Sequence, residues 1–182
     1  MVTDCMRILF HWFYCLPIAE AVLLIVLTTV FFLILRKRFG DTACWKAGVP
    51  VLFICWIAVI FFGTLGQRSE GANLSEPILT PFYSYSIALN GGSRELYRAN
   101  FMNTVLFYPA GLLGCEITSK HWKKAWRMIL VTCVFALVSI GIEYIQYRFA
   151  MGLAEVDDVI HNTLGTLLGA LICGASIRRR RL

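Results

Sequence analysis

Residues 142–169 read IEYIQYRFAMGLAEVDDVIHNTLGTLLG and set seven charged or amide side chains between two apolar runs. Charged and amide groups at the edge of hydrocarbon cost several kcal/mol when they lack partners. A chain that gathers them there either builds a polar site or pins helices together. Besides Glu155, they are Glu143, Gln146, Arg148, Asp157, Asp158 and Asn162.

Composition places these runs in a membrane. The chain has 182 residues, of which 58% are hydrophobic and 15% charged, and both values depart from those of a soluble globular domain. A membrane-spanning helix needs about 20 mostly apolar residues. We therefore predict one domain over residues 1–182, an all-α compact bundle of about five transmembrane helices. The predicted spans are about Pro17 to Leu35, Val49 to Leu65, Phe101 to Ile117, Met128 to Tyr147 and Val159 to Ile177.

The basic residues predict how the bundle is oriented. Twelve of the seventeen Lys and Arg fall in three stretches, within 36–46, 120–127 and 178–181, and the remaining five fall in the alternate connections. By the positive-inside rule the three stretches face the cytoplasm. This predicts a multi-pass membrane protein with an outside N-terminus and a cytoplasmic C-terminus. Basic runs of this kind set topology, so we expect no nucleic-acid partner. Around His11 the chain is predicted to form a short interfacial segment before the first span.

Under this topology the polar side chains share one level on the extracytoplasmic side. Glu143 and Gln146 are three residues apart and lie on one helix face, as do Asp158 and Asn162, four residues apart. Arg98, Asn100 and Asn103 stand at the start of the third predicted span, at the same depth. The long connection from Gly66 to Arg98 carries a Pro and aromatic cluster, and we predict that this loop caps a polar site. The candidate binding residues are Arg98, Asn103, Glu143, Gln146, Arg148, Asp158 and Asn162.

A structural interpretation of each residue stands beside the functional one. Glu143, Asp157 or Asp158 can form ion pairs with Arg98 or Arg148, and such pairs fix the register of the helices. Buried amide side chains often form hydrogen bonds between helices. Adjacent helical residues diverge by about 100 degrees, so Asp157 and Asp158 do not face one site. We therefore assign Asp158 to the site and Asp157 to a helix N-cap. Glu20, Glu116 and His161 are interpreted as structural.

Three segments resemble the signature of the VanZ-like family of bacterial membrane proteins. They read NTVLFYPAG from Asn103 to Gly111, EYIQ from Glu143 to Gln146, and DDVIHNTLGTLLG from Asp157 to Gly169. Pro81 and Phe82 resemble a further element of that family. Members often carry an arginine shortly before the acidic pair, whereas this chain has leucine, alanine and glutamate at 153–155. The family's name comes from members associated with resistance to teicoplanin-type lipoglycopeptides.

The resemblance implies a cell-envelope function, and two hypotheses follow. In the first, the protein binds or shields a membrane lipid, an amphiphilic lipid-linked cell-wall precursor or the lipoglycopeptide at the outer leaflet, and lowers drug occupancy. In the second, it is a membrane enzyme that modifies a lipid or polyprenyl headgroup. Glu143 or Asp158 would then be the acid-base group, Arg98 or Arg148 would bind a phosphate or carboxylate, and Asn103 and Asn162 would orient the substrate.

We favour the binding hypothesis over the enzymatic one. The sequence has no nucleophile set of Ser, Cys and His and no metal-ligand spacing, so we expect neither a cofactor nor a bound metal. Paired acids such as these could nevertheless hold a divalent ion. Gly165 and Gly169 form a G-x-x-x-G, which predicts the close approach of another helix. A third and weaker hypothesis is a passive scaffold that uses this motif to join partner helices.

Overall fold

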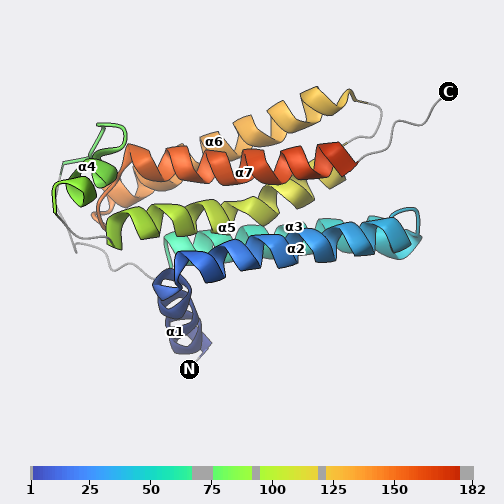
Figure 1. Ribbon diagram of the computed structural model, residues 1–182, viewed down its shortest axis with the longest axis horizontal. Helices are drawn as coiled ribbons and strands as arrows, with labels where there is room; N and C mark the ends of the chain where they lie inside the picture. The colour runs from blue at the N-terminus through green and yellow to red at the C-terminus, as the bar shows by residue number, and fades with distance from the viewer. Residues whose placement is uncertain (1, 67–75, 92–94, 119–121, 177–182) are drawn as a thin grey trace.

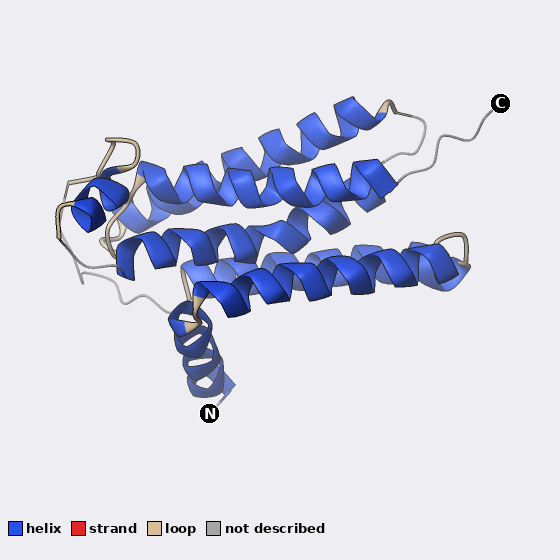
Figure 2. Cartoon of the chain, in the orientation of Figure 1, coloured by secondary structure: helices blue, strands red, loops and turns tan. Residues whose placement is uncertain are grey.

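The helices of the protein follow the apolar runs of its sequence. The computed structural model describes residues 2–66, 76–91, 95–118 and 122–176, and over these ranges the chain forms helices and no strand (Figure 2). The basic run 178–181 and Lys120, on which part of the topology prediction rests, lie outside the described residues. The elements are α1 (Val2–Cys15), α2 (Ile18–Phe39), α3 (Ala43–Thr64), α4 (Tyr83–Leu89), α5 (Glu95–Ile117), α6 (Lys124–Arg148) and α7 (Val156–Ser176).

Among the described residues, four helices are long and apolar enough to cross a membrane, namely α2, α3, α6 and α7. A helix of 22 residues, such as α2 or α3, rises about 33 Å, which matches the hydrocarbon core of about 30 Å. Large apolar side chains such as Phe31 on α2 and Leu137 on α6 are exposed on the outside of the bundle. Apolar faces of this extent indicate contact with lipid. The all-α membrane bundle is therefore confirmed.

The third predicted span forms helix α5, but α5 is not among the four apolar helices. It carries Glu95, Arg98, Asn100, Asn103 and Glu116. Most of its residues from 100 to 116 are buried, because α5 packs against helices on several sides. A helix enclosed by other helices needs no continuous apolar surface toward lipid. Its polar residues can instead bond to its neighbours.

The five long helices run side by side, with α5 between the α6–α7 pair and the α2–α3 pair (Figure 1). Helix α1 crosses the bundle axis at the end where α4 lies (Figure 1). We call this end the α4 end, and the end that holds the α2–α3 turn the turn end. At the turn end the Thr42 side chain accepts the Trp45 backbone N–H at 3.2 Å and caps α3.

Helices α5 and α7 approach each other at glycines. A Cβ added at Gly165 would lie 2.2 Å from the Thr104 carbonyl oxygen, and one added at Gly169 would lie 2.1 Å from that of Tyr108. From the opposite helix, a Cβ on Gly111 would lie 2.0 Å from the Thr166 carbonyl oxygen. The predicted close approach at the G-x-x-x-G therefore occurs. Its partner is α5 of the same chain, so this face is not free to join another protein.

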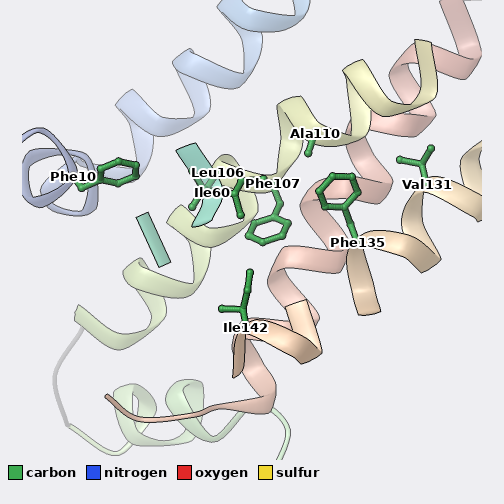
Figure 3. Packing of buried hydrophobic residues seen from close by; sticks show 8 residues of the cluster. All are labelled: Phe10, Ile60, Leu106, Phe107, Ala110, Val131, Phe135 and Ile142. Atoms are coloured by element: carbon green, nitrogen blue, oxygen red, sulfur yellow. The ribbon is translucent and has the colours of Figure 1, made fainter. Parts of the chain in front are cut away.

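The core between these helices is built from large apolar side chains. Figure 3 shows one cluster, to which α1, α3, α5 and α6 all contribute. The Phe107 ring meets Phe135 edge-on, with ring centroids 6.2 Å apart. This packing fixes the positions of α5 and α6, which carry much of the polar site described next. The cluster consists of Phe10, Ile60, Leu106, Phe107, Ala110, Val131, Phe135 and Ile142.

Candidate functional site at the α4 end

The polar site begins at the junction of α5 and α7. Asn103 of α5 donates its side-chain amide N–H to Asp158 Oδ1 of α7 at 2.8 Å. Its amide oxygen accepts the Tyr14 hydroxyl of α1 at 3.0 Å. One amide thus links three helices, and it brings together two residues predicted for the site. Tyr14 was not predicted, because nothing in the sequence marks it apart from the aromatic residues around it.

Helix α6 contributes a polar face to the same end of the bundle. Ser139, Glu143 and Gln146 are spaced four and three residues apart, so they share one face of the helix. Glu143 Oε2 accepts the Glu155 backbone N–H at 3.0 Å, which ties α6 to the segment before α7. Gln146 donates to the Thr64 carbonyl oxygen at 3.0 Å, and this carbonyl belongs to the last turn of α3, which lacks helical donors.

Two amide oxygens at this site are buried without partners. Asn162 donates to the Ser139 hydroxyl at 2.8 Å, and Gln146 donates to α3, yet the Oδ1 of Asn162 and the Oε1 of Gln146 have no hydrogen bond among the described residues. Each of these side chains is only 1% exposed. A buried unsatisfied acceptor costs about 1–3 kcal/mol. Each oxygen can therefore accept a hydrogen bond that no described residue supplies.

The two arginines predicted for the site lie in different surroundings. Arg98 of α5 is half-buried, and its Nε is buried without a partner among the described residues. The Arg148 side chain is exposed in the last turn of α6. Of the two, Arg98 is the one that can present a donor to the interior of the bundle, whereas Arg148 is directed toward the surface.

Asp157 has a different role from the one predicted. We expected it to be the N-cap of the last helix, but it lies in the first turn of α7 and its carboxylate reaches α4. One oxygen accepts the Phe82 backbone N–H, and the other accepts the Ser84 backbone N–H at 3.2 Å and the Ser84 hydroxyl at 2.7 Å. A carboxylate at a helix N-terminus is stabilised by the free N–H groups there. Asp157 therefore fastens α4 to the bundle.

His161 makes a second link between α7 and α4. Its Nδ1 lies 2.6 Å from the Asp157 carbonyl oxygen, which can only accept, so Nδ1 carries the proton. Its Nε2 lies 2.7 Å from the Tyr85 hydroxyl. With the proton of the neutral ring on Nδ1, Nε2 accepts from this hydroxyl. Burial, and next the charge of Asp157, raise the pKa of Tyr85 and keep its phenol protonated. The structural interpretation of His161 agrees with these bonds.

These links make α4 the predicted cap over the site. The two rings of Tyr85 and His161 stack with centroids 5.7 Å apart, and Asn100 of α5 donates to the Ser84 hydroxyl at 2.6 Å. The preceding segment pairs with the strand-like stretch before α7, since Ile78 donates to the Ala154 carbonyl oxygen and accepts from Val156 N–H at 2.9 and 3.0 Å. The first part of the connection, residues 67–75, lies outside the described residues.

Asp157→Ala is expected to release α4 while the spanning helices remain folded. The change removes an acceptor for three donors, and hydrogen bonds to charged groups are worth about 1.5–3 kcal/mol each. Hydrogen exchange of the amides in 83–89 should become much faster, with little change in α6. Ser86→Ala, an exposed change in the same helix, is the control. Equal protection of α4 in Asp157→Ala and the control would contradict the fastening role.

The fold and the site together define a class of protein: a small membrane helix bundle with a polar cluster at one end, which α4 covers. Within the described residues, no group of three or more His, Cys, Asp or Glu side chains is placed to hold a metal ion. The family is given by comparison. The chain belongs to the VanZ/LLP1 family, whose model matches residues 49–177.

A characterised relative supports the same family. Protein VanZ of Enterococcus faecium is 34% identical over 98 residues, which cover 54% of this chain and 52% of that protein. The similarity therefore spans about half the length of that relative. No solved structure matches the chain.

Proposed function

We propose that the protein binds an amphiphile with a hydrogen-bonding headgroup at the outer leaflet, either a lipid-linked cell-wall precursor or a lipoglycopeptide, and confers teicoplanin-type resistance. Membership in the VanZ/LLP1 family supports a role in this resistance. The observation that carries the binding proposal is the pair of buried, unpartnered amide oxygens on Gln146 and Asn162. A headgroup rich in hydroxyl or amide donors would satisfy them.

The charges of the site favour the same kind of ligand. Glu143 and Asp158 add carboxylate acceptors beside the amides, and Arg98 adds a donor that suits a phosphate or carboxylate. A peptide or sugar headgroup attached to a phosphate offers both kinds of partner. Arg148, at the surface of the same end, would meet such a headgroup only from outside the helix bundle.

The proposed orientation places the α4 end outside the cell. The basic residues that the structure describes at the turn end include Arg36, Lys37, Arg38 and Lys46, and Lys124 begins α6 at that end. The positive-inside rule assigns such an end to the cytoplasm. An impermeant thiol reagent applied to intact cells should therefore leave Cys44, exposed beside the α2–α3 turn, unlabelled.

Glu143→Gln and Asp158→Asn are expected to abolish protection against teicoplanin at near-normal membrane levels. Each change keeps an oxygen for the observed bond, from Glu155 N–H or from Asn103, while it removes the charge and replaces the other oxygen by an NH₂ donor. Asp41→Asn, an exposed carboxylate in the α2–α3 turn, is the matched control. Susceptibility to teicoplanin and to a glycopeptide without an acyl tail is measured with protein abundance in the same cells.

Three results of this experiment would count against the proposal. Full protection by both variants at wild-type abundance would remove the site from the mechanism. Equal protection against the two drugs would exclude recognition of the acyl tail. If the membrane abundance of the variants falls together with protection, the two carboxylates hold helices together rather than bind a ligand. An ion pair that loses one partner leaves a buried charge, and this lowers the amount of folded protein.

A further inference from the structure

The unpartnered amide oxygens at the α4 end are enclosed by the protein. The side chains of Gln146 and Asn162 are each 1% exposed, and the Oε1 of the first and the Oδ1 of the second are buried. Asn103 and Glu143 beside them are 7% and 9% exposed. A ligand that donates to the two amide oxygens, as the proposed function requires, can reach them only after part of the structure moves.

The long helices around the site resist such a movement. Backbone atoms of α5 and α7 touch at Gly165 and Gly169, so these two helices are in close contact along their length. Phe10 of α1 and Phe135 of α6 belong to one apolar cluster, which α3 and α5 also join. Separating any of these helices would expose buried apolar surface, which is costly. They form the fixed part of the site.

Helix α4 is held in a different way. All seven of its residues are described, and of these Ser84 alone is buried. Its links to the bundle are hydrogen bonds, from Ser84 to Asp157, from Asn100 to Ser84 and between Tyr85 and His161. Hydrogen bonds can be exchanged for bonds to water at a small net cost, whereas apolar burial cannot. Among the elements at this end, α4 is therefore the one that can leave at the lowest cost.

The backbone on either side of α4 is suited to a hinge. Phe82, which precedes the helix, has a φ of 61°, and Gly91, two residues after it, has a φ of 86°. Glycine adopts such values freely, but a bulky residue is strained there. Strained residues of this kind persist where surrounding bonds hold them, and they are common at switch regions. The bond that holds Phe82 is the one from its N–H to the Asp157 carboxylate.

We propose that α4 is a lid over the polar site, latched by Asp157, and that it swings away before a ligand reaches Gln146 and Asn162. The inference rests on the proposed function for the ligand, whereas the opening itself is a property of the protein alone. Asp157 is a positioning residue, because it contacts the lid and not the ligand. A ligand that donates to the two amide oxygens satisfies them once the lid closes, so its binding favours the closed state.

The test measures how fast a water-soluble maleimide reacts with the thiol introduced by Asn162→Cys, in the full-length protein in lipid nanodiscs. The five exposed native cysteines are replaced by alanine, and the buried Cys115 and Cys173 remain as reporters of global unfolding. We expect Asp157→Ala to speed the reaction by about tenfold or more, because three bonds to a charged acceptor are lost. Ser86→Ala, exposed on α4, should leave the rate unchanged.

A second comparison distinguishes the lid from α1, the other short helix at this end. Tyr14→Phe removes the bond from α1 to Asn103 and leaves α4 untouched, so it should accelerate the reaction far less than Asp157→Ala. Equal acceleration by the two changes would assign the opening to α1 and overturn the lid. The lid is equally excluded if Asp157→Ala reacts as slowly as Ser86→Ala.

Faster labelling of Cys115 and Cys173 in Asp157→Ala would mean that this variant unfolds. Asp157→Asn then decides, since it keeps one oxygen of the latch: acceleration at the introduced thiol alone supports the lid, and an unchanged rate contradicts it. Labelling needs no ligand, whereas the drug susceptibility of Glu143→Gln reads the binding proposal. Either proposal can therefore fail while the other stands.

Discussion

Gly165→Leu is expected to remove most of the folded protein from the membrane. Even the first atom of the new side chain would lie 2.2 Å from the Thr104 carbonyl oxygen, which is backbone of α5 and cannot rotate away. Overpacking a core costs about 1–3 kcal/mol where side chains can adjust. Here two helices must separate, and the buried bonds around Asn103 and Asp158 separate with them. The loss in the free energy of unfolding should therefore exceed about 1–3 kcal/mol.

Gly141→Leu is the control for this experiment. Gly141 is also a helical glycine, in α6, but a Cβ there meets nothing within 4 Å. Leucine has a higher helix propensity than glycine, so this change should be neutral or slightly stabilising. Membrane abundance and the thermal unfolding midpoint in detergent are compared for the two variants. Equal abundance would show that α5 and α7 do not need their close approach.

Breaking the ion pair at the turn end is expected to have the second largest effect. Arg36 of α2 lies 2.9 Å from Glu116 of α5, and their side chains are 14% and 4% exposed. Arg36 also donates to the Cys173 carbonyl oxygen and to Ser176 of α7, while Glu116 accepts the Trp45 indole N–H at 3.2 Å. Removing one partner of a buried pair costs about 3–5 kcal/mol, because it leaves an uncompensated charge.

The matched comparison is a double-mutant cycle with methionine, which has a similar volume and no charge. Glu116→Met and Arg36→Met should each lower the free energy of unfolding by about 3–5 kcal/mol. The double variant should recover much of the loss, since an apolar pair often replaces a buried ion pair at little cost. Unfolding is followed in a detergent titration. A double variant as unstable as the sum of the single variants would show that the two residues act independently.

Several features of the site were predictable because they depend on spacing along one helix. The i,i+3 and i,i+4 rules put Glu143 with Gln146 and Asp158 with Asn162 on single faces, and they separate Asp157 from Asp158. In the structure Asp158 bonds to Asn103, whereas Asp157 points to α4. The partner of Asp157 could not be predicted from the sequence. It is α4, a short helix in a long connection, whose position no apolar periodicity indicates.

By itself, the sequence determined the all-α class of the bundle, its membrane setting and the helix face on which each polar residue lies, because these depend on hydrophobicity and on the 3.6-residue period. Tertiary structure alone decided which faces meet. It placed α5 inside the bundle, turned the Gly165 face toward Gly111, buried Arg98 more deeply than Arg148 and joined His161 to Tyr85. These pairings join residues far apart in the chain, and such contacts follow from the packing of whole helices rather than from any local pattern.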